Sequence, residues 1–250
     1  MNPVTETIYL IIQLAILVPL GLSSLYLFFF AGAGIFYRQP RYPVAGRHRR
    51  IAVLIPGYRE DAVIVDSAAD ALLQDYPMEQ YDVIVIADSF LPQTLNRLRN
   101  LPVRVIEVSF DKSTKVRALN RAMEQLGHYY ELAVILDADN LMAKDFLGKV
   151  NSFFESDHIA VQGHRTAKNL DSSLAVLDAA SEEINNHIFR KGHRAVGLSS
   201  AIIGSGMAFR YGYFKDLMAT VTAVGGFDKE IELKMLRQKN RIGYLDDALV

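Results

Sequence analysis

The first hydrophobic pattern along the chain is the stretch 8–37, which contains no charged side chain. A helix of about 30 residues is about 45 Å long, enough to cross a hydrocarbon core of about 30 Å. A cleaved signal peptide has a shorter apolar part, of about 7–15 residues, behind a basic start. Here the only charged side chain before the stretch is Glu6. The pattern therefore predicts one transmembrane anchor, over 8–37, within an N-terminal segment 1–50.

After residue 50, short apolar runs alternate with amphipathic stretches. The runs are continuously hydrophobic, which is typical of parallel strands that are buried on both faces. The run 103–108 contains Arg104 and Glu107, so we place it nearer the edge of the sheet. The predicted strands are 51–56, 83–87, 103–108 and 133–136, and the predicted helices between them are 61–74, 91–100 and 116–126.

Beyond residue 140 the alternation is less regular. Helices are predicted at 144–154, 172–189 and 229–239, and strands at 159–163, 202–210 and 241–245. No repeat or low-complexity linker interrupts 51–250. We therefore expect one α/β domain with a mostly parallel central sheet, whose ligands bind at the carboxyl ends of the strands.

The charges are divided unevenly between these two parts. Five of the 27 Lys and Arg residues, but only one of the 28 Asp and Glu residues, lie in 1–50. The basic cluster follows the apolar stretch, so the positive-inside rule predicts a cytoplasmic location for the rest of the chain, with the cluster near membrane lipid. Residues 51–250 are net negative, which argues against a nucleic-acid partner. The absence of Cys excludes a thiol nucleophile and a thiolate zinc site.

Acidic side chains follow three of the predicted strands: Glu60 and Asp61, then Asp88, then Asp137 and Asp139. A single Asp after a strand is often a turn former or a helix cap. Because the ends of parallel strands share one edge of a sheet, however, we expect these carboxylates to converge. Asp137 and Asp139, two residues apart, can supply oxygen ligands to Mg²⁺ or Mn²⁺ and leave positions for phosphate oxygens. The alternative for this pair is a polar turn.

Five short blocks spread in order over 51–250 resemble those of the family 2 glycosyltransferases, which have the GT-A fold. Arg59, Ala87 and Phe227 depart from the residues usual in that family. The blocks are Ile55-Pro56-Gly57-Tyr58-Arg59-Glu60, Val85-Ile86-Ala87-Asp88-Ser89, Lys115-Val116-Arg117-Ala118-Leu119-Asn120, Asp137-Ala138-Asp139 and Gly226-Phe227-Asp228-Lys229.

The resemblance implies a Rossmann-like nucleotide-binding half and assigns roles to individual residues. It makes Asp139, assisted by Asp137, the ligand of Mg²⁺ or Mn²⁺, and Asp228 the catalytic base, with Glu230 as second choice. It places Gly204, Ser205 and Gly206 near the acceptor, where the alternative is a bulge or turn. The residues that it implies for nucleotide binding are Pro56, Tyr58, Glu60, Asp88, Lys115 and Asp137.

The expected reaction is an inverting transfer of sugar from a nucleotide-diphospho-sugar, with a UDP-sugar favoured, to a hydroxyl acceptor at the cytoplasmic membrane face. A metal can stabilise the departing diphosphate without a proton donor, so one base is sufficient.

Two other functions remain open from the sequence. One is a phosphohydrolase of the haloacid dehalogenase type, which also uses an Asp-x-Asp motif. The other is a membrane-tethered scaffold with a degenerate transferase fold. The chain contains no Trp and therefore lacks the Gln-x-x-Arg-Trp motif of processive synthases. Family members usually continue into further helices, so the end at Val250 is consistent with a C-terminally truncated chain.

Overall fold

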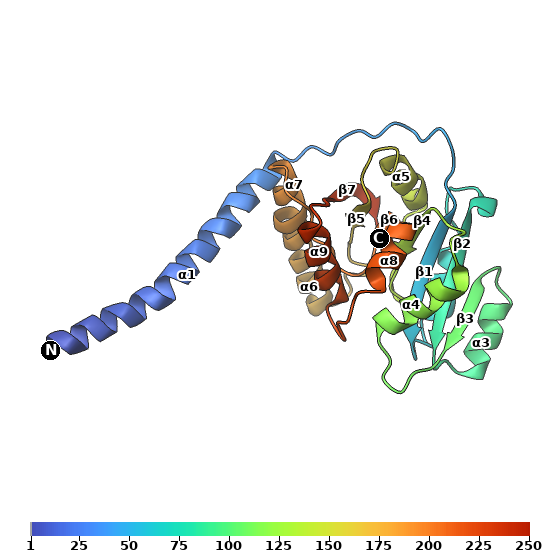
Figure 1. Ribbon diagram of the computed structural model, residues 1–250, viewed down its shortest axis with the longest axis horizontal. Helices are drawn as coiled ribbons and strands as arrows, with labels where there is room; N and C mark the ends of the chain where they lie inside the picture. The colour runs from blue at the N-terminus through green and yellow to red at the C-terminus, as the bar shows by residue number, and fades with distance from the viewer. Residues whose placement is uncertain (1) are drawn as a thin grey trace.

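The computed structural model describes residues 2–250, and Figure 1 shows a long N-terminal helix standing away from an α/β domain. This helix, α1 (Pro3–Ile35), is the one helix of the described residues that is long and apolar enough to cross a membrane. Only Phe30 and Gly34 of α1 are buried. The predicted anchor therefore corresponds to a helix that begins earlier and ends two residues sooner than expected.

A seven-stranded sheet forms the centre of the domain, in the order β3-β2-β1-β4-β6-β5-β7. Neighbours in this order are parallel except β6, which runs antiparallel to both β4 and β5. The predicted edge position of the third strand is confirmed. The strands are β1 (Ile51–Tyr58), β2 (Tyr81–Asp88), β3 (Arg104–Val108), β4 (Leu132–Ile135), β5 (Ala160–His164), β6 (Met207–Arg210) and β7 (Ile242–Leu249).

Helices cover both faces of the sheet, which explains the continuous hydrophobic runs. Alternate β1 residues face opposite ways, so that Val53 belongs to one core and Leu54 to the other. The first core packs against α2 (Ile64–Asp70), α3 (Pro92–Arg99) and α5 (Phe146–Phe153), and the second against α4 (Lys115–Leu126), α8 (Tyr211–Met218) and α9 (Phe227–Arg237). A short 3-10 helix, η1 (Met78–Gln80), precedes β2.

Three elements differ from the sequence prediction. The strand expected at 202–210 is formed only by β6, because Gly204 and Gly206 have φ angles of 80° and 61°, in the left-handed region that ends regular strand geometry. The helix expected at 172–189 is α6 (Ser173–Asn185), which continues as a π-helix, η2 (Asn186–Gly192), and a last short turn, α7 (His193–Ala195). Helix α8 was not predicted.

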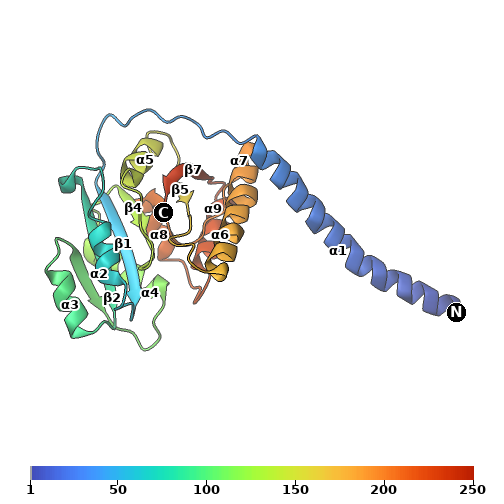
Figure 2. The ribbon, with the colours of Figure 1, turned by 180° about the vertical axis from the view of Figure 1, so that it is seen from behind.

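The last turns of α1 pack against η2 and α7, and Figure 2 shows α7 beside the end of α1. The Tyr26 hydroxyl lies 2.6 Å from His193 Nε2, and His187 Nε2 lies 2.8 Å from the Ala31 carbonyl oxygen. A Cβ on Gly192 would lie 2.3 Å from the Phe30 carbonyl oxygen, so the two backbones approach closely because this position is glycine.

An extended linker, residues 36–50, runs from α1 across the domain to β1 (Figure 1). Its basic residues are not all available to lipid, because Arg47 pairs with Glu131 and the nearly buried Arg49 pairs with Glu155 at 2.7 Å. Arg38 and Arg41 remain exposed.

Candidate functional site

The ends of β1 and β2 form the first part of the candidate site. Tyr58 and Asp88 are register partners at the last positions of these parallel strands. The backbone N–H of Arg59 donates to the Asp88 carbonyl oxygen at 3.1 Å, and Arg59 has φ of 55°, a left-handed conformation that a non-glycine residue rarely adopts. The chain therefore turns sharply at the point where two of the predicted nucleotide-binding blocks meet.

The predicted nucleotide-binding residues of these two strands differ in exposure. Tyr58 and Glu60 are exposed, whereas Asp88 is only 2% exposed and accepts a hydrogen bond from the Ser89 hydroxyl at 2.9 Å. Pro56 is buried inside β1. In this state Tyr58 and Glu60 can meet a ligand directly, while Pro56 and Asp88 contribute to the shape of the turn.

Lys115 joins the other segments of the candidate site. It is the first residue of α4, whose N-terminus is capped by the Thr114 hydroxyl. Its ammonium pairs with Asp137 and donates to the Gly204 carbonyl oxygen at 2.8 Å. The same ammonium lies 5.1 Å from the centre of the Phe227 ring at the start of α9. One cation thus joins four segments that lie far apart in the sequence.

The Asp137–Asp139 loop follows β4 and is held by Ser205. The fully buried Ser205 hydroxyl oxygen accepts from the Asp137 backbone N–H at 3.0 Å and from the Asn140 side-chain amide at 2.7 Å. At Gly206 a Cβ would lie 2.2 Å from Val250. Ser205 and Gly206, predicted on the acceptor side, therefore lie beneath the loop and support it, and they present no surface to an acceptor in this state.

Asp139 is exposed and lines a cleft of about 900 Å³. No hydrogen bond or ion pair joins its carboxylate to any residue of 2–250, and no group of three or more His, Asp or Glu residues in that range is arranged to hold a metal. Mg²⁺ and similar ions commonly bind one or two carboxylates and take further ligands from water and substrate phosphates. The donor set of Asp139 and Asp137 fits such an ion, with Asp137 also paired to Lys115.

Asp228 and Glu230 differ clearly in their surroundings. Asp228, near the start of α9, is partly exposed, and its Cβ lies 3.9 Å from the point that a Cβ on Gly204 would occupy. The Glu230 carboxylate instead accepts from the backbone N–H groups of Thr222 and Ala223, at 3.1 and 2.8 Å, and pairs with Lys234. Although burial alone would raise the pKa of Glu230, these bonds lower it. Glu230 is therefore engaged in holding the preceding loop.

The sequence did not indicate the residues that form the far wall of the cleft. The wall consists of the segment after β5, with Arg165 and Lys168, and one side of α6, with Ala175 and Ala179. The only hint in the sequence of this wall was the pair of basic residues, Arg165 and Lys168, just after the predicted strand 159–163. Pairing of α6 with this segment depends on contacts that no local pattern reveals.

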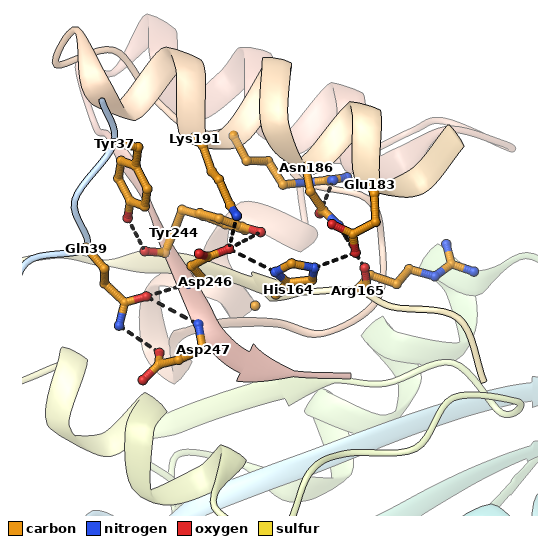
Figure 3. A network of polar contacts seen from close by, with 12 residues as sticks. Tyr37, Gln39, His164, Arg165, Glu183, Asn186, Lys191, Tyr244, Asp246 and Asp247 are labelled. Carbon is orange, nitrogen blue, oxygen red and sulfur yellow. Dashed lines mark hydrogen bonds and ion pairs between the residues drawn. The ribbon is translucent and has the colours of Figure 1, made fainter. Parts of the chain in front are cut away.

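A polar network anchors α6 and η2 to the strands beside the cleft (Figure 3). The two ring nitrogens of His164 lie 2.7 Å from a Glu183 carboxylate oxygen and 2.9 Å from an Asp246 carboxylate oxygen. Burial lowers the pKa of His164, but the hydrogen bonds to the two carboxylates outweigh it and raise the pKa above its ordinary value. Lys191 adds a second cation, 2.8 Å from Asp246.

The family model described as "Glycosyltransferase like family 2" matches residues 48–250. The beta-monoglucosyldiacylglycerol synthase of Nostoc sp. (strain PCC 7120 / SAG 25.82 / UTEX 2576) is 25% identical over 187 residues, which cover 71% of this chain and 40% of the relative. The chain thus spans less than half the length of this curated relative.

Solved structures share the fold. The mannosyltransferase PcManGT from Pyrobaculum calidifontis, in complex with GDP-Man and Mn²⁺, superposes with a TM-score of 0.69 at 20% identity, over 95% of this chain and 67% of that one. S. aureus TarS 1-349 with UDP-GlcNAc gives 0.57 at 17% identity, over 80% and 57%. Glucosyl-3-phosphoglycerate synthase from Mycobacterium tuberculosis, with Mn²⁺, UDP and phosphoglyceric acid, gives 0.55 at 17% identity, over 84% and 74%.

These findings decide between the enzyme classes that the sequence left open. The phosphohydrolase interpretation is wrong, because the matched family is a transferase family and the Asp137–Asp139 loop follows the fourth strand of the sheet, not the first. The family model covers well over half of the chain, and the fold is that of GT-A glycosyltransferases. The chain therefore belongs to glycosyltransferase family 2 and is a glycosyltransferase.

Proposed function

We propose that this protein transfers a sugar from a nucleotide-diphospho-sugar to a hydroxyl acceptor at the cytoplasmic face of a membrane, with inversion at the anomeric carbon. The observation that carries the proposal is the convergence on Lys115 of Asp137, Gly204 and the start of α9, beside the exposed Asp139. Solved relatives of the same fold are complexes with GDP-Man, UDP-GlcNAc or UDP, which supports a donor of this class.

The donor is proposed to lie along the ends of β1, β2 and β4. Tyr58 and Glu60 offer exposed side chains at the end of β1, and Asp88 shapes the adjoining turn. Lys115 holds Asp137 in place and brings a positive charge to the diphosphate side of the site. Pro56 is assigned to the shape of β1 and not to direct contact.

Asp139 and Asp137 are the proposed ligands of Mg²⁺ or Mn²⁺. When bound, such an ion stabilises the negative charge that develops on the leaving nucleoside diphosphate. The complexes of two solved relatives with Mn²⁺ support this assignment.

Asp228 is the proposed general base, which takes the proton of the acceptor hydroxyl as the oxygen attacks the anomeric carbon. It is partly exposed, close to Gly204, and lies in the first turn of α9. With one base and a metal-stabilised leaving group, direct displacement from the opposite face inverts the anomeric centre. Glu230 is engaged by backbone N–H groups and is assigned no proton transfer.

The acceptor is proposed to enter from the cleft between Asp139 and α6. The name of the curated relative, a beta-monoglucosyldiacylglycerol synthase, makes diacylglycerol the first acceptor to test. Gly204, whose carbonyl is held by Lys115, is the one residue of the segment 204–206 that remains assigned to the acceptor side.

The test is release of nucleoside diphosphate by the full chain in membranes. UDP-sugars and GDP-mannose are supplied in turn with Mn²⁺ or with a chelator, and the anomeric configuration of the product is read by NMR. We expect metal-dependent release and an inverted product. Asp228→Asn should lower turnover by about 10²–10⁴-fold while donor binding persists, because general-base assistance contributes about that factor.

Glu230→Gln is the matched control, two residues further along the same helix, and should retain turnover. If Glu230→Gln loses turnover and Asp228→Asn does not, the base is wrongly assigned. If no donor releases nucleoside diphosphate in the presence of Mn²⁺, the catalytic proposal fails and a degenerate scaffold is favoured.

A further inference from the structure

Helix α6 is built with its hydrophobic side facing outward. None of its residues is buried, and its large side chains Leu174, Leu177 and Ile184 are 68%, 66% and 57% exposed. Leu170, just before the helix, is 63% exposed. Within the helix, the spacings of three and seven residues between Leu174, Leu177 and Ile184 place these side chains on one face. An exposed apolar stripe of this kind marks a surface that is covered by a partner.

The opposite face of α6 is polar and is committed to the domain. Glu183 contacts His164 at 2.7 Å, and Glu182 pairs at 3.0 Å with Arg190, whose side chain is almost fully buried. The Asn186 amide donates to the Arg165 carbonyl oxygen at 2.9 Å. Figure 3 shows Glu183, Asn186 and Lys191 directed from the helix toward the strands. The helix cannot turn its leucines inward without breaking these contacts, so the stripe stays on the outside.

The stripe is continuous with the end of α1. The elements η2 and α7 continue directly from α6, and these turns pack against Tyr26, Phe30 and Ala31 of α1. Figures 1 and 2 both show α6 on the side of the domain from which α1 leaves. A surface that begins beside the end of a membrane-crossing helix meets the lipid headgroup region first.

We propose that the outer face of α6 rests in the interfacial layer of the membrane that α1 crosses. The proposal depends on the membrane attachment given under the proposed function. Since α6 contains no Lys or Arg, the contact is apolar, and anionic lipid is not required. A second copy of the chain is the other occupant that such a stripe could accept, and the experiment below distinguishes it.

This placement specifies the class of acceptor. Ala175 and Ala179, on another side of the same helix, line the cleft that contains Asp139. With α6 at the lipid surface, that cleft opens beside the headgroups. The acceptor is therefore a membrane lipid whose hydroxyl-bearing headgroup enters the cleft while its acyl chains remain in the bilayer.

The chain has no cysteine, so single cysteines can be labelled cleanly with an environment-sensitive fluorophore. The full chain is reconstituted in phosphatidylcholine vesicles as Leu177→Cys, on the stripe, Leu17→Cys, in α1, and Leu73→Cys, beyond α2. The three leucines are similarly exposed, at 66%, 62% and 60%. Quenching is measured with nitroxides on the lipid acyl chains and with aqueous iodide, and diphosphate release is assayed in parallel.

We expect the label at residue 177 to be quenched by a nitroxide near the headgroup and shielded from iodide, the label at 17 to be quenched by a deeper nitroxide, and the label at 73 to be quenched by iodide alone. Raised salt should leave lipid quenching at 177 unchanged. If 17 responds to lipid and 177 responds only to iodide, the α6 contact is refuted while membrane attachment stands.

Shielding of 177 from both quenchers overturns the proposal in favour of a second copy. If 17 does not respond to lipid, attachment itself fails, and the α6 proposal fails with it. Sugar transfer is measured separately and can survive each of these outcomes.

Discussion

The buried hydroxyl of Ser205 fixes the position of a loop that carries two carboxylates. Its oxygen accepts hydrogen bonds from both Asp137 and Asn140, which follow β4, whereas Ser205 itself precedes the neighbouring strand β6. The Lys115 ammonium holds the same loop from a third direction. The geometry of Asp137 and Asp139 thus depends on Ser205 and Lys115, which hold the loop from outside it.

Ser205→Ala should lower the free energy of unfolding by about 1–3 kcal/mol, because the Asp137 N–H and the Asn140 amide lose their acceptor inside the protein. Urea unfolding in detergent measures this change. Ser67→Ala is the matched control, since the Ser67 hydroxyl is equally buried but has no partner among residues 2–250. Equal losses for both variants would show that the Ser205 hydrogen bonds do not support the loop.

At the scale of single residues, four positions that the resemblance assigned to the site lie close together, but the sequence did not show how they divide their work. Asp137, Lys115, Gly204 and Asp228 do lie together. Ser205 was placed near the acceptor by the family resemblance, yet its partners are 65 and 68 residues away in sequence. Glu230 was the second choice for the base, and its contacts with the 222–223 backbone now distinguish it from Asp228.

At the scale of elements, His164 joins β5 to β7 and to α6. Its neighbours are mostly charged: Glu183 and Asp246 contact the ring, Lys191 and the Tyr244 hydroxyl contact Asp246, and Glu182 and Arg190 lie on the same helical segment as Glu183. The imidazolium form satisfies both carboxylates at once, since both ring N–H groups can then donate.

His164→Gln should reduce stability by about 2 kcal/mol at pH 6 and by less at pH 9. Because the folded-state pKa of His164 is raised, its stabilising effect is complete below the ordinary histidine value of about 6.5 and is lost as the pH rises through the folded-state pKa. Urea unfolding at the two pH values tests this. Exposed His128→Gln is the control, and a loss that is independent of pH would contradict a charged His164.

The contact between α1 and η2 depends on small residues. Gly34→Ala should destabilise it by about 1–3 kcal/mol, because the new Cβ would lie 2.8 Å from the His187 carbonyl oxygen. Gly32→Ala, two residues earlier on α1, meets nothing within 4 Å and should be neutral or slightly stabilising. Thermal unfolding in detergent, with the rate of proteolysis in linker 36–50, separates the two variants. Similar behaviour of both would argue against tight packing here.

Most elements follow from hydrophobic periodicity, and the exceptions have physical causes. The parallel strands β1, β2 and β4 are continuous apolar runs and were predicted within about two residues. The segment before β6 is apolar but carries glycines in left-handed conformations, which periodicity does not reveal. The change from α6 to a π-helix accompanies the burial of Asn186 and Arg190, a tertiary effect.

At the scale of the whole molecule, the charge distribution predicts the orientation in the membrane. Arg38 and Arg41 stay exposed just after α1, while the Glu6 end carries no basic side chain. A membrane-impermeant maleimide should label Leu73→Cys only in inverted vesicles and Thr5→Cys only in intact cells whose outer surface is open to the reagent. Labelling in the reverse pattern would place the catalytic domain outside the cytoplasm.

The linker that leaves α1 is fastened before it reaches β1. The Gln39 side chain bonds the Asp247 carboxylate at 2.7 Å and the Asp246 backbone N–H at 2.5 Å, and the Tyr37 hydroxyl donates to the Tyr244 carbonyl oxygen at 3.1 Å. These bonds run along β7, the last strand at that edge of the sheet (Figure 3). The linker is consequently fixed to the edge of the domain and is not a free tether between the domain and α1. On a bilayer it would hold the domain at a single height, so acceptors would have to diffuse to a stationary opening.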